Sequence, residues 1–441
     1  MNVPVPANVP EVRSIGRSFT SFRIAVPAAF VTCLFTGAAR ADTPSPPWVE
    51  EGEAPLPGWT RSVTPPKGLR GGPGDMVLFS EPSRGSPRRG LTIPSATLPV
   101  FGARRGPGCS GRWWLVGPLA WACSDGAAFS PDEPQSPVRA TRPDGLQREY
   151  FFVGQEGTSA YSSLESAQEG APDRELEGGW AVGVVGRQVA NGERYVLTSK
   201  GLWIAERDLG AARPSSFHGE AVGDGALDLA WVLSEHASVW PAPPPPAAKP
   251  KDAKARFQLV HVLEERGAYV RVGDGEWMLA RDLARPHVAA PPAEVTRPGE
   301  RWIDVELATQ TLVAYEGARP VFATLVSTGR GPVGSEAATP PGVHRIWVKI
   351  VASDMASTER DDVGSHYSLE DVPYVQFFDK AVALHGTYWH RDFGHVRSHG
   401  CVNLAPLDAR WLFDFTGPRV PQAWAAAYPT ALDPGTAVRV H

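Results

Sequence analysis

The sequence predicts a mainly β protein. Short stretches that alternate apolar and polar residues recur along the chain and are separated by turns. The 44 Pro and 45 Gly among 441 residues are typical of short strands joined by turns and linkers. We expect one clear helix, from about Pro406 to Phe415, which Gly417-Pro418 stops.

Length and charge limit the class of protein. A chain of 441 residues is too long for one ordinary domain, so we expect two to four. The formal net charge of −5 gives no global basic field that would attract nucleic acid. The 15 Trp are many, and small β-domains often use Trp as their main core residue.

Residues 1–41 have the pattern of a secretion signal. Basic residues precede an apolar run over 24–37, and Ala39-Arg40-Ala41 is an A-x-A cleavage site that would leave Asp42 as the mature start. The run is shorter than the ~20 residues that span a bilayer, although an uncleaved signal anchor is the alternative. We therefore expect export to the periplasm or cell envelope, with membrane contact only during export.

Cysteine usage agrees with an oxidising compartment. Cleavage would remove Cys33 and leave three cysteines. Cys109 and Cys123 are 14 residues apart in a Trp-rich segment, a spacing that suits a disulfide across a hairpin. Cys401 is left unpaired, so it is either a reactive thiol or a buried inert one, and its surroundings must decide.

The region before the last domain divides into several parts. We expect a Pro/Gly-rich tether over 42–89 and a linker over 288–299. Between them the pattern Y-x5-G-x-W-x3-R-D-L occurs twice, beginning at Tyr195 and at Tyr269, which indicates one structural unit used more than once. The units that carry these repeats resemble bacterial SH3-like domains, which are small β-barrels found beside wall enzymes. We place them over 90–150 (a more diverged copy), 151–212, and 226–287 (with a Pro-rich insertion).

The last domain, 300–441, is predicted to be mostly β. Alternating or apolar stretches predict strands over 303–307, 312–315, 321–328 and 343–351, joined by tight turns. The predicted helix lies near its end.

One segment of this domain carries the candidate chemistry. It runs through His385-Gly386-Thr387-Tyr388-Trp389-His390 and, further on, Ser398-His399-Gly400-Cys401-Val402-Asn403. A thiol becomes a strong nucleophile when a neighbouring imidazole takes its proton. His385 ends an apolar strand, and a loop of about a dozen residues could return Cys401 to its side. The glycines would let the backbone approach a substrate and turn freely.

These residues resemble the L,D-transpeptidase catalytic domain, also called the YkuD-like domain. Its signature is a His-Gly-type dipeptide, a spacer of about 15 residues, then Ser/Thr-His-Gly-Cys, an apolar residue, and Arg or Asn. The resemblance covers about 300–441 and implies a β-sandwich with a short helix. It also implies an enzyme that acts on the bacterial cell wall.

The resemblance implies roles for individual residues. Cys401 would be the nucleophile and His385 the general base, with the Gly386 carbonyl orienting the imidazole. His399 and Ser398 would shape the surroundings of the thiol.

Further roles concern the substrate. The N–H groups of Gly400 and Cys401 are candidates for the oxyanion hole. Tyr374 would lie over the substrate cleft, and Trp389 is a further candidate for substrate binding. Asn403 stands where many members have Arg, so carboxylate binding by that Arg cannot be transferred.

The reaction implied is acyl transfer from a peptidoglycan stem tetrapeptide through a Cys401 thioester, which gives 3–3 cross-links. Water as acceptor would make a carboxypeptidase, and a protein lysine would attach a protein to the wall. We expect no cofactor, no nucleic-acid partner and a monomer; the expected partner is the stem peptide or a wall-attached protein.

Two alternatives stand beside this interpretation. The first is a metal site built from histidines and the thiol: His385, His390, His395, His399 and Cys401. The lone thiol and the lack of a Cys-x2-Cys pair fit a nucleophile better, so we expect no metal and interpret His390 and His395 as loop residues lining the cleft. The second alternative is a wall-binding protein whose catalytic domain is inactive.

Overall fold

The computed structural model describes residues 62–64, 75–94, 96–126, 128–130, 141–223, 226–243, 249–356 and 367–441. The predicted signal peptide, its apolar run and Cys33 lie outside these residues. Within the described ranges, no helix has the length and apolar character needed to cross a bilayer. The chain divides into two compact units. The first holds Arg139–Val420 and Ala426–His441, and the second holds the region up to Val138 together with Pro421–Ala425.

The second unit is built around buried tryptophans. Trp113 is fully buried and packs edge-on against Phe79, and a disulfide joins Cys109 to Cys123. The strands of its main sheet, in spatial order, are β3 (Arg88–Thr92), β2 (Val77–Phe79), β7 (Ala120–Cys123), β6 (Trp113–Gly117) and β5 (Gly102–Arg104). A smaller sheet has the order β4 (Leu98–Pro99), β1 (Ser62–Thr64) and β8 (Ala128–Ser130), and η1 (Ser124–Gly126) is a 3-10 turn.

The predicted tether over 42–89 extends too far toward the C-terminus. The strand β2 lies inside that range, and its Phe79 pairs with Trp121 of β7. The cause is the short apolar run Val77-Leu78-Phe79, whose Leu78 is fully buried. Three apolar residues are enough for a strand when neighbouring strands complete the sheet. The Pro and Gly residues around this short strand make the whole segment look like a linker in the sequence.

The two copies of the repeat fold in the same order. In each, the Tyr begins or lies in one strand, the Trp lies in the next, a 3-10 turn carries Arg-Asp, and the Leu begins a third strand. The first copy comprises β13 (Glu193–Thr198), β14 (Trp203–Ala205), η2 (Glu206–Asp208) and β15 (Leu209–Ala211). The second comprises β22 (Tyr269–Gly273), β23 (Glu276–Leu279), η3 (Ala280–Asp282) and β24 (Leu283–Ala284).

The strands of the first copy belong to one large sheet, whereas those of the second copy form small separate sheets, and no closed barrel is found among the described residues. The barrel part of the predicted fold is therefore not found. Around the first copy lie β9 (Glu149–Val153), β10 (Thr158–Ala160), α1 (Leu164–Glu169), β11 (Arg174–Leu176) and β12 (Ala181–Ala190). Around the second lie β17 (Leu229–Val232), β18 (His236–Val239), β19 (Asp252–Ala255), β20 (Leu259–His261) and β21 (Glu264–Arg266).

The C-terminal domain packs two groups of strands and one helix around a common core, which confirms the predicted mainly β sandwich with a short helix. One sheet has the order β16 (Glu220–Ala221), β27 (Arg319–Leu325), β26 (Thr311–Glu316), β25 (Arg301–Glu306), β34 (Ala437–Val440) and β28 (Gly342–Arg345). The other runs through β33 (Trp424–Ala427), β29 (Val348–Ala356), β30 (Ser368–Asp379), β31 (Val382–Gly386) and β32 (Val402–Leu404).

The single strand predicted over 343–351 is two strands. The strand β28 pairs with β34 in the first sheet, whereas β29 pairs with β30 in the second. Ile346, fully buried between them, marks the place where the chain crosses from one sheet to the other. Because no Gly or Pro interrupts residues 343–351, the sequence pattern does not reveal the crossing.

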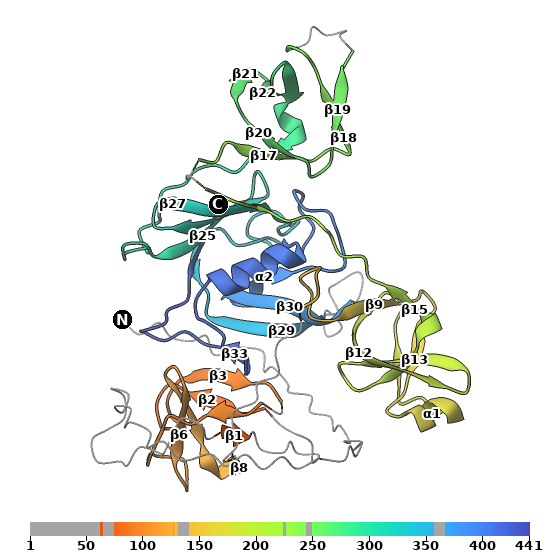
Figure 1. Ribbon diagram of the computed structural model, residues 1–441, viewed down its shortest axis with the longest axis vertical. Coiled ribbons are helices and arrows are strands. Elements are labelled where there is room, and N and C mark those ends of the chain that lie inside the picture. The colour runs from red at the N-terminus through yellow and green to blue at the C-terminus, as the bar shows by residue number, and fades with distance from the viewer. Residues whose placement is uncertain are drawn as a thin grey trace, which may run out of the picture. The chain divides into compact units, whose positions relative to one another are not determined.

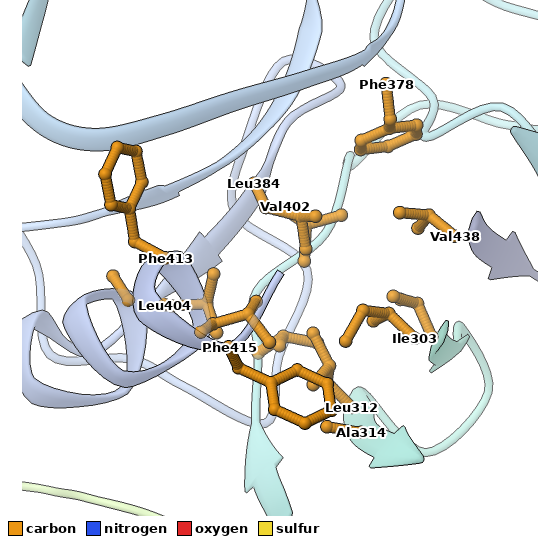
Figure 2. Packing of buried hydrophobic residues seen from close by; sticks show 14 of the residues in the cluster. Ile303, Leu312, Ala314, Phe378, Leu384, Val402, Leu404, Phe413, Phe415 and Val438 are labelled. Carbon is orange, nitrogen blue, oxygen red and sulfur yellow. The ribbon is translucent and has the colours of Figure 1, made fainter. Parts of the chain in front are cut away.

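The helix α2 (Pro406–Phe415) fixes the position of the candidate site strands. Proline stands at its N-terminal turn, where no N–H is needed, and the helix packs its buried face on β30 and β31. Figure 1 shows α2 between the β25–β27 strands and the β29–β30 strands. Figure 2 shows Leu384 of β31 and Val402 of β32 side by side in this core, with Phe413 of the helix on one side and Val438 on the other.

Candidate active site

The register between β31 and β32 brings the candidate nucleophile and base together. The two strands are parallel, with Leu384 opposite Val402 and His385 opposite Asn403. Leu384 and Val402 are fully buried in the core. Side chains alternate between the two faces of a strand, so His385 and Asn403 point to the opposite face. Cys401, just before β32, shares that face and lies one diagonal step from His385.

The segment between the strands is anchored along its length rather than free. The N–H groups of Arg397 and Ser398 both bond the carbonyl of Thr328, and Gly394 N–H bonds that of Val326. Asn403 exchanges two backbone hydrogen bonds with Ser327. These bonds hold the return to Cys401 against the end of β27, which explains how a long connection can place the thiol reproducibly.

The imidazole of His385 is held by its neighbour's backbone. Its Nδ1 lies 3.1 Å from the carbonyl oxygen of Gly386. Because that carbonyl can only accept, Nδ1 carries the proton and Nε2 is free to act as a base. His385 is almost completely buried, and this burial lowers its pKa to about 4 despite the opposing effect of the Gly386 carbonyl.

Close packing around Gly386 leaves no space for a side chain. A Cβ there would lie 3.0 Å from Cγ of Pro373 and 3.2 Å from Cβ of Ala409 on α2. The glycine therefore lets the helix approach β31 closely, which fixes the strand that carries the base.

The thiol of Cys401 rests in its neutral form. Burial raises its pKa to about 11, because the surrounding protein disfavours the thiolate. The sulfur's hydrogen-bond contact is the carbonyl oxygen of Ala381 at 3.9 Å, and no hydrogen bond joins it to His385. A neutral thiol and a neutral imidazole therefore lie on the same face, and the proton must move between them during attack rather than before it.

The turn before Cys401 is closed by Ser398. The Gly400 N–H donates to Oγ of Ser398 at 3.1 Å, and that hydroxyl donates to the carbonyl of Cys401. In this structure the Gly400 N–H, an expected donor of the oxyanion hole, is therefore engaged with the Ser398 hydroxyl. The Cys401 N–H has no hydrogen-bond partner in the part of the chain that the structure describes, so it is the available donor.

Gly400 itself requires glycine. Its φ of +131° lies in a region that other residues rarely adopt, and a Cβ would lie 3.3 Å from the carbonyl oxygen of Ala338. The carbonyl of Gly400 accepts from Oγ1 of Thr339 at 2.7 Å, which ties this turn to the segment after β27.

Asn403 and Trp389 both contact the histidines of the site. The side-chain amide of Asn403 lies 2.9 Å from Nε2 of His390. The ring of Trp389 is partly exposed, and its centroid is 5.6 Å from that of His385. Burial, followed by the positive charge of Arg397, lowers the pKa of His390 to about 4. His390, predicted to be a loop residue lining the cleft, is thus a partly buried neighbour of Asn403.

Two expected residues lie elsewhere. Tyr374 was predicted over the cleft, but it is 5% exposed, belongs to the hydrophobic core, and donates its hydroxyl to the Gly145 carbonyl at 2.8 Å. Its φ of +60° turns the side chain into the core, a conformation that sequence does not reveal. His399 is exposed, where it contacts the guanidinium of Arg330 and stacks on Tyr367, so it lies on the rim rather than beside the sulfur.

The histidines do not gather into a ligand set with Cys401. In the described ranges, the one group of three ligand-type side chains with atoms close together is Cys109, Cys123 and Asp125, whose cysteines are disulfide-bonded. His395 and His399 are exposed on the 391–399 loop. The geometry is that of a thiol–imidazole pair with a neighbouring amide.

Comparison with known proteins identifies this domain. Residues 300–440 match the model of the YkuD family, the L,D-transpeptidase catalytic domain. This part of the chain is therefore an L,D-transpeptidase catalytic domain of the YkuD family. The upstream repeats are not assigned to a family by this match.

Solved structures with similarity include three L,D-transpeptidases. One from Enterococcus faecium is 22% identical over 32% of this chain and 50% of its own, with a TM-score of 0.25. One from Stackebrandtia nassauensis is 30% identical over 32% of this chain and 55% of its own, with a TM-score of 0.22. One from Mycobacterium smegmatis is 16% identical over 59% of this chain and 99% of its own, with a TM-score of 0.26.

This chain thus spans about half the length of the first two structures. A search of curated proteins found no match.

Proposed function

We propose that this protein is a peptidoglycan L,D-transpeptidase that forms 3–3 cross-links through a thioester on Cys401. The observation that supports the proposal is the parallel register of β31 and β32, in which His385 lies opposite Asn403, two residues after Cys401. The family match over 300–440 supports the same class of chemistry.

The acylation step begins with the neutral thiol of Cys401 and the neutral imidazole of His385. The sulfur of Cys401 attacks the carbonyl carbon of the third residue of a stem tetrapeptide, while its proton passes to Nε2 of His385. The Gly386 carbonyl, bonded to Nδ1–H, stabilises the imidazolium that forms. The Cys401 N–H donates to the developing oxyanion. The carbon–nitrogen bond to the terminal D-residue then breaks, and His385 returns the proton to the leaving amine.

The second half transfers the acyl group. The side-chain amine of a neighbouring stem attacks the thioester, and His385 takes a proton from it. The carbon–sulfur bond breaks, and the thiolate recovers the proton as the thiol. With water as the acceptor the product is a tripeptide, and with a protein lysine it is a protein attached to the wall.

The assay is incubation with purified disaccharide-tetrapeptide, followed by mass analysis of the products. The proposal predicts a cross-linked dimer and the free terminal residue, both absent with Cys401→Ala. Tripeptide alone would indicate the carboxypeptidase, and an exchanged product without dimer would leave the acceptor to be sought among proteins. Folded wild-type protein that releases no terminal residue would favour an inactive wall-binding protein.

Location follows from the N-terminal pattern. We propose that residues 1–41 direct export and that the mature enzyme acts in the periplasm or cell envelope, where its substrate lies. N-terminal sequencing of protein recovered from the envelope should begin at Asp42. An N-terminus that retains the apolar run would instead favour a signal anchor.

A further inference from the structure

The inference concerns His390 and the side-chain amide of Asn403. Asn403 is as buried as His385, its partner across the two strands, with exposed fractions of 3% and 2%. Both point to the face that carries the thiol. One polar atom at the end of the Asn403 side chain has no hydrogen-bond partner in the described ranges. A buried polar atom without a partner is costly, so its presence beside a nucleophile needs an explanation.

The hydrogen bonds around His390 fix which of its nitrogens carries a proton. The backbone N–H of Asp392 donates to Nδ1 of His390 at 3.2 Å. A nitrogen that accepts carries no proton, so a neutral His390 holds its proton on Nε2. Burial keeps His390 neutral, because it lowers the pKa to about 4.

That proton decides the orientation of the Asn403 amide. Nε2–H of His390 must donate, but the structure places Nδ2 of Asn403, which is also a donor, 2.9 Å away, with Oδ1 on the side without a partner in the described ranges. The two ends of an amide are alike in shape, so the hydrogen-bond partner determines which end is the oxygen. The oxygen of Asn403 therefore faces His390, and the NH2 group takes the side that has no partner in the described ranges.

The loop that carries His390 is itself fixed. The carbonyl of Asp392 accepts from Oγ of Ser327 at 2.9 Å, and its carboxylate pairs with Arg256 at 2.7 Å. The ring of Phe393, fully buried, lies 5.2 Å from that of His390. These contacts hold the imidazole in place, so it can hold the amide.

We infer that His390 is a positioning residue: it fixes the amide of Asn403 so that the NH2 group donates to a carbonyl oxygen of the acyl-donor peptide beside Cys401. This inference rests on the proposed function for the identity of the donor. It gives Asn403 a role that differs from carboxylate binding by an Arg at the same place, because a neutral amide recognises a neutral carbonyl.

The kinetic test compares substitutions of His390 in the full chain, with disaccharide-tetrapeptide as the donor. His390→Gln keeps an N–H donor at the place of Nε2 and should retain kcat/KM for the donor within about threefold. His390→Asn and His390→Leu lack a donor there and should lose about 10- to 100-fold, as expected for one misplaced hydrogen bond. The KM of the acceptor should not change. Val396→Ala, on the same loop and exposed, is the matched control and should behave as wild type.

A double-mutant cycle separates positioning from a merely structural role. In an Asn403→Ala background, His390→Leu should cause no further loss of kcat/KM, because the group that His390 orients is gone. Additive losses, or equal activity of the Gln and Asn variants, would overturn the inference. If wild-type protein makes no product at all, the proposed function fails instead.

A second readout does not depend on activity. Long-range proton–nitrogen NMR of the imidazoles distinguishes the two neutral tautomers, and the signals of His390 are assigned by their loss in His390→Gln. The inference predicts the Nε2–H form for His390 and the Nδ1–H form for His385. A His390 that carries its proton on Nδ1 would contradict the inference, whatever the enzyme's activity.

Discussion

The raised pKa of Cys401 makes the pH dependence of its alkylation a sharp prediction. Iodoacetamide reacts with the thiolate, so the rate follows the fraction of Cys401 that is ionised. With a pKa of about 11 instead of 9.0, the ionised fraction at pH 7 is roughly one in ten thousand, about a hundredfold below that of an unburied cysteine. His385, with a pKa of about 4, is neutral at that pH and offers no charge to stabilise a thiolate.

The assay measures the alkylation rate of the peptide that contains Cys401 by mass spectrometry between pH 5 and 10. The rate should rise about tenfold per pH unit through the whole range, since ionisation is far from complete. The same cysteine in the urea-unfolded chain is the matched control and should level off near its ordinary value. Cys401→Ala gives the background.

A plateau in the folded protein below pH 8 would refute this reasoning. Such a plateau would mean that the thiolate and the His385 imidazolium form an ion pair at rest, which requires a hydrogen bond between them. Acylation of Cys401, measured as release of the terminal D-residue in a single turnover, should be nearly independent of pH between about 5 and 10, because neutral His385 takes the proton directly from the neutral thiol.

Three further predictions concern stability, each measured by urea unfolding. Gly386→Ala should lower the free energy of unfolding by about 1–3 kcal/mol, because its Cβ would contact α2 and β30. Gly210→Ala, which has open space around it, should lower it by under about 1 kcal/mol. Equal losses for the two variants would contradict the packing argument. Asp408→Ala should lower the free energy of unfolding by about 1–3 kcal/mol, because it leaves the N–H of Gly219 without its 2.9 Å acceptor. An unchanged free energy of unfolding would mean that water replaces the carboxylate. The pKa of His385 is about 4 in the folded protein and 6.5 in the unfolded chain. Its contribution to the stability of the fold is therefore fully present above pH 6.5 and is lost as the pH falls toward 4. Between pH 6.5 and 5, wild type should lose about 1.5 kcal/mol relative to His385→Gln, and a constant difference would contradict the lowered pKa.

Sequence alone locates the chemistry because the motif is local and its spacing is constrained. His385 ends an apolar strand, and Cys401 opens another, so alternation places both on the face opposite the core. The helix over 406–415 is equally predictable, since Pro at its start and Gly-Pro after its end mark both limits.

Other features depend on contacts that no local pattern encodes. Tyr374 enters the core through a positive φ, and the two strands within 343–351 separate only because they pair with different sheets. The partnership of His390 with Asn403 spans 13 residues and depends on how the intervening loop is anchored. The crowding of histidines in this segment is the available signal, but the same crowding also suggests a metal site.

The most direct test of the central claim is to trap the acyl-enzyme. Wild-type protein is mixed with disaccharide-tetrapeptide whose side-chain amine has been acetylated, so that no acceptor amine is present, and is then quenched in acid, digested, and examined by mass spectrometry. The account predicts that the peptide containing Cys401 gains the mass of the donor less its terminal D-residue, and that this adduct disappears when an acceptor amine is added before quenching. Release of the terminal residue without an adduct, or undiminished release by Cys401→Ala, would contradict it.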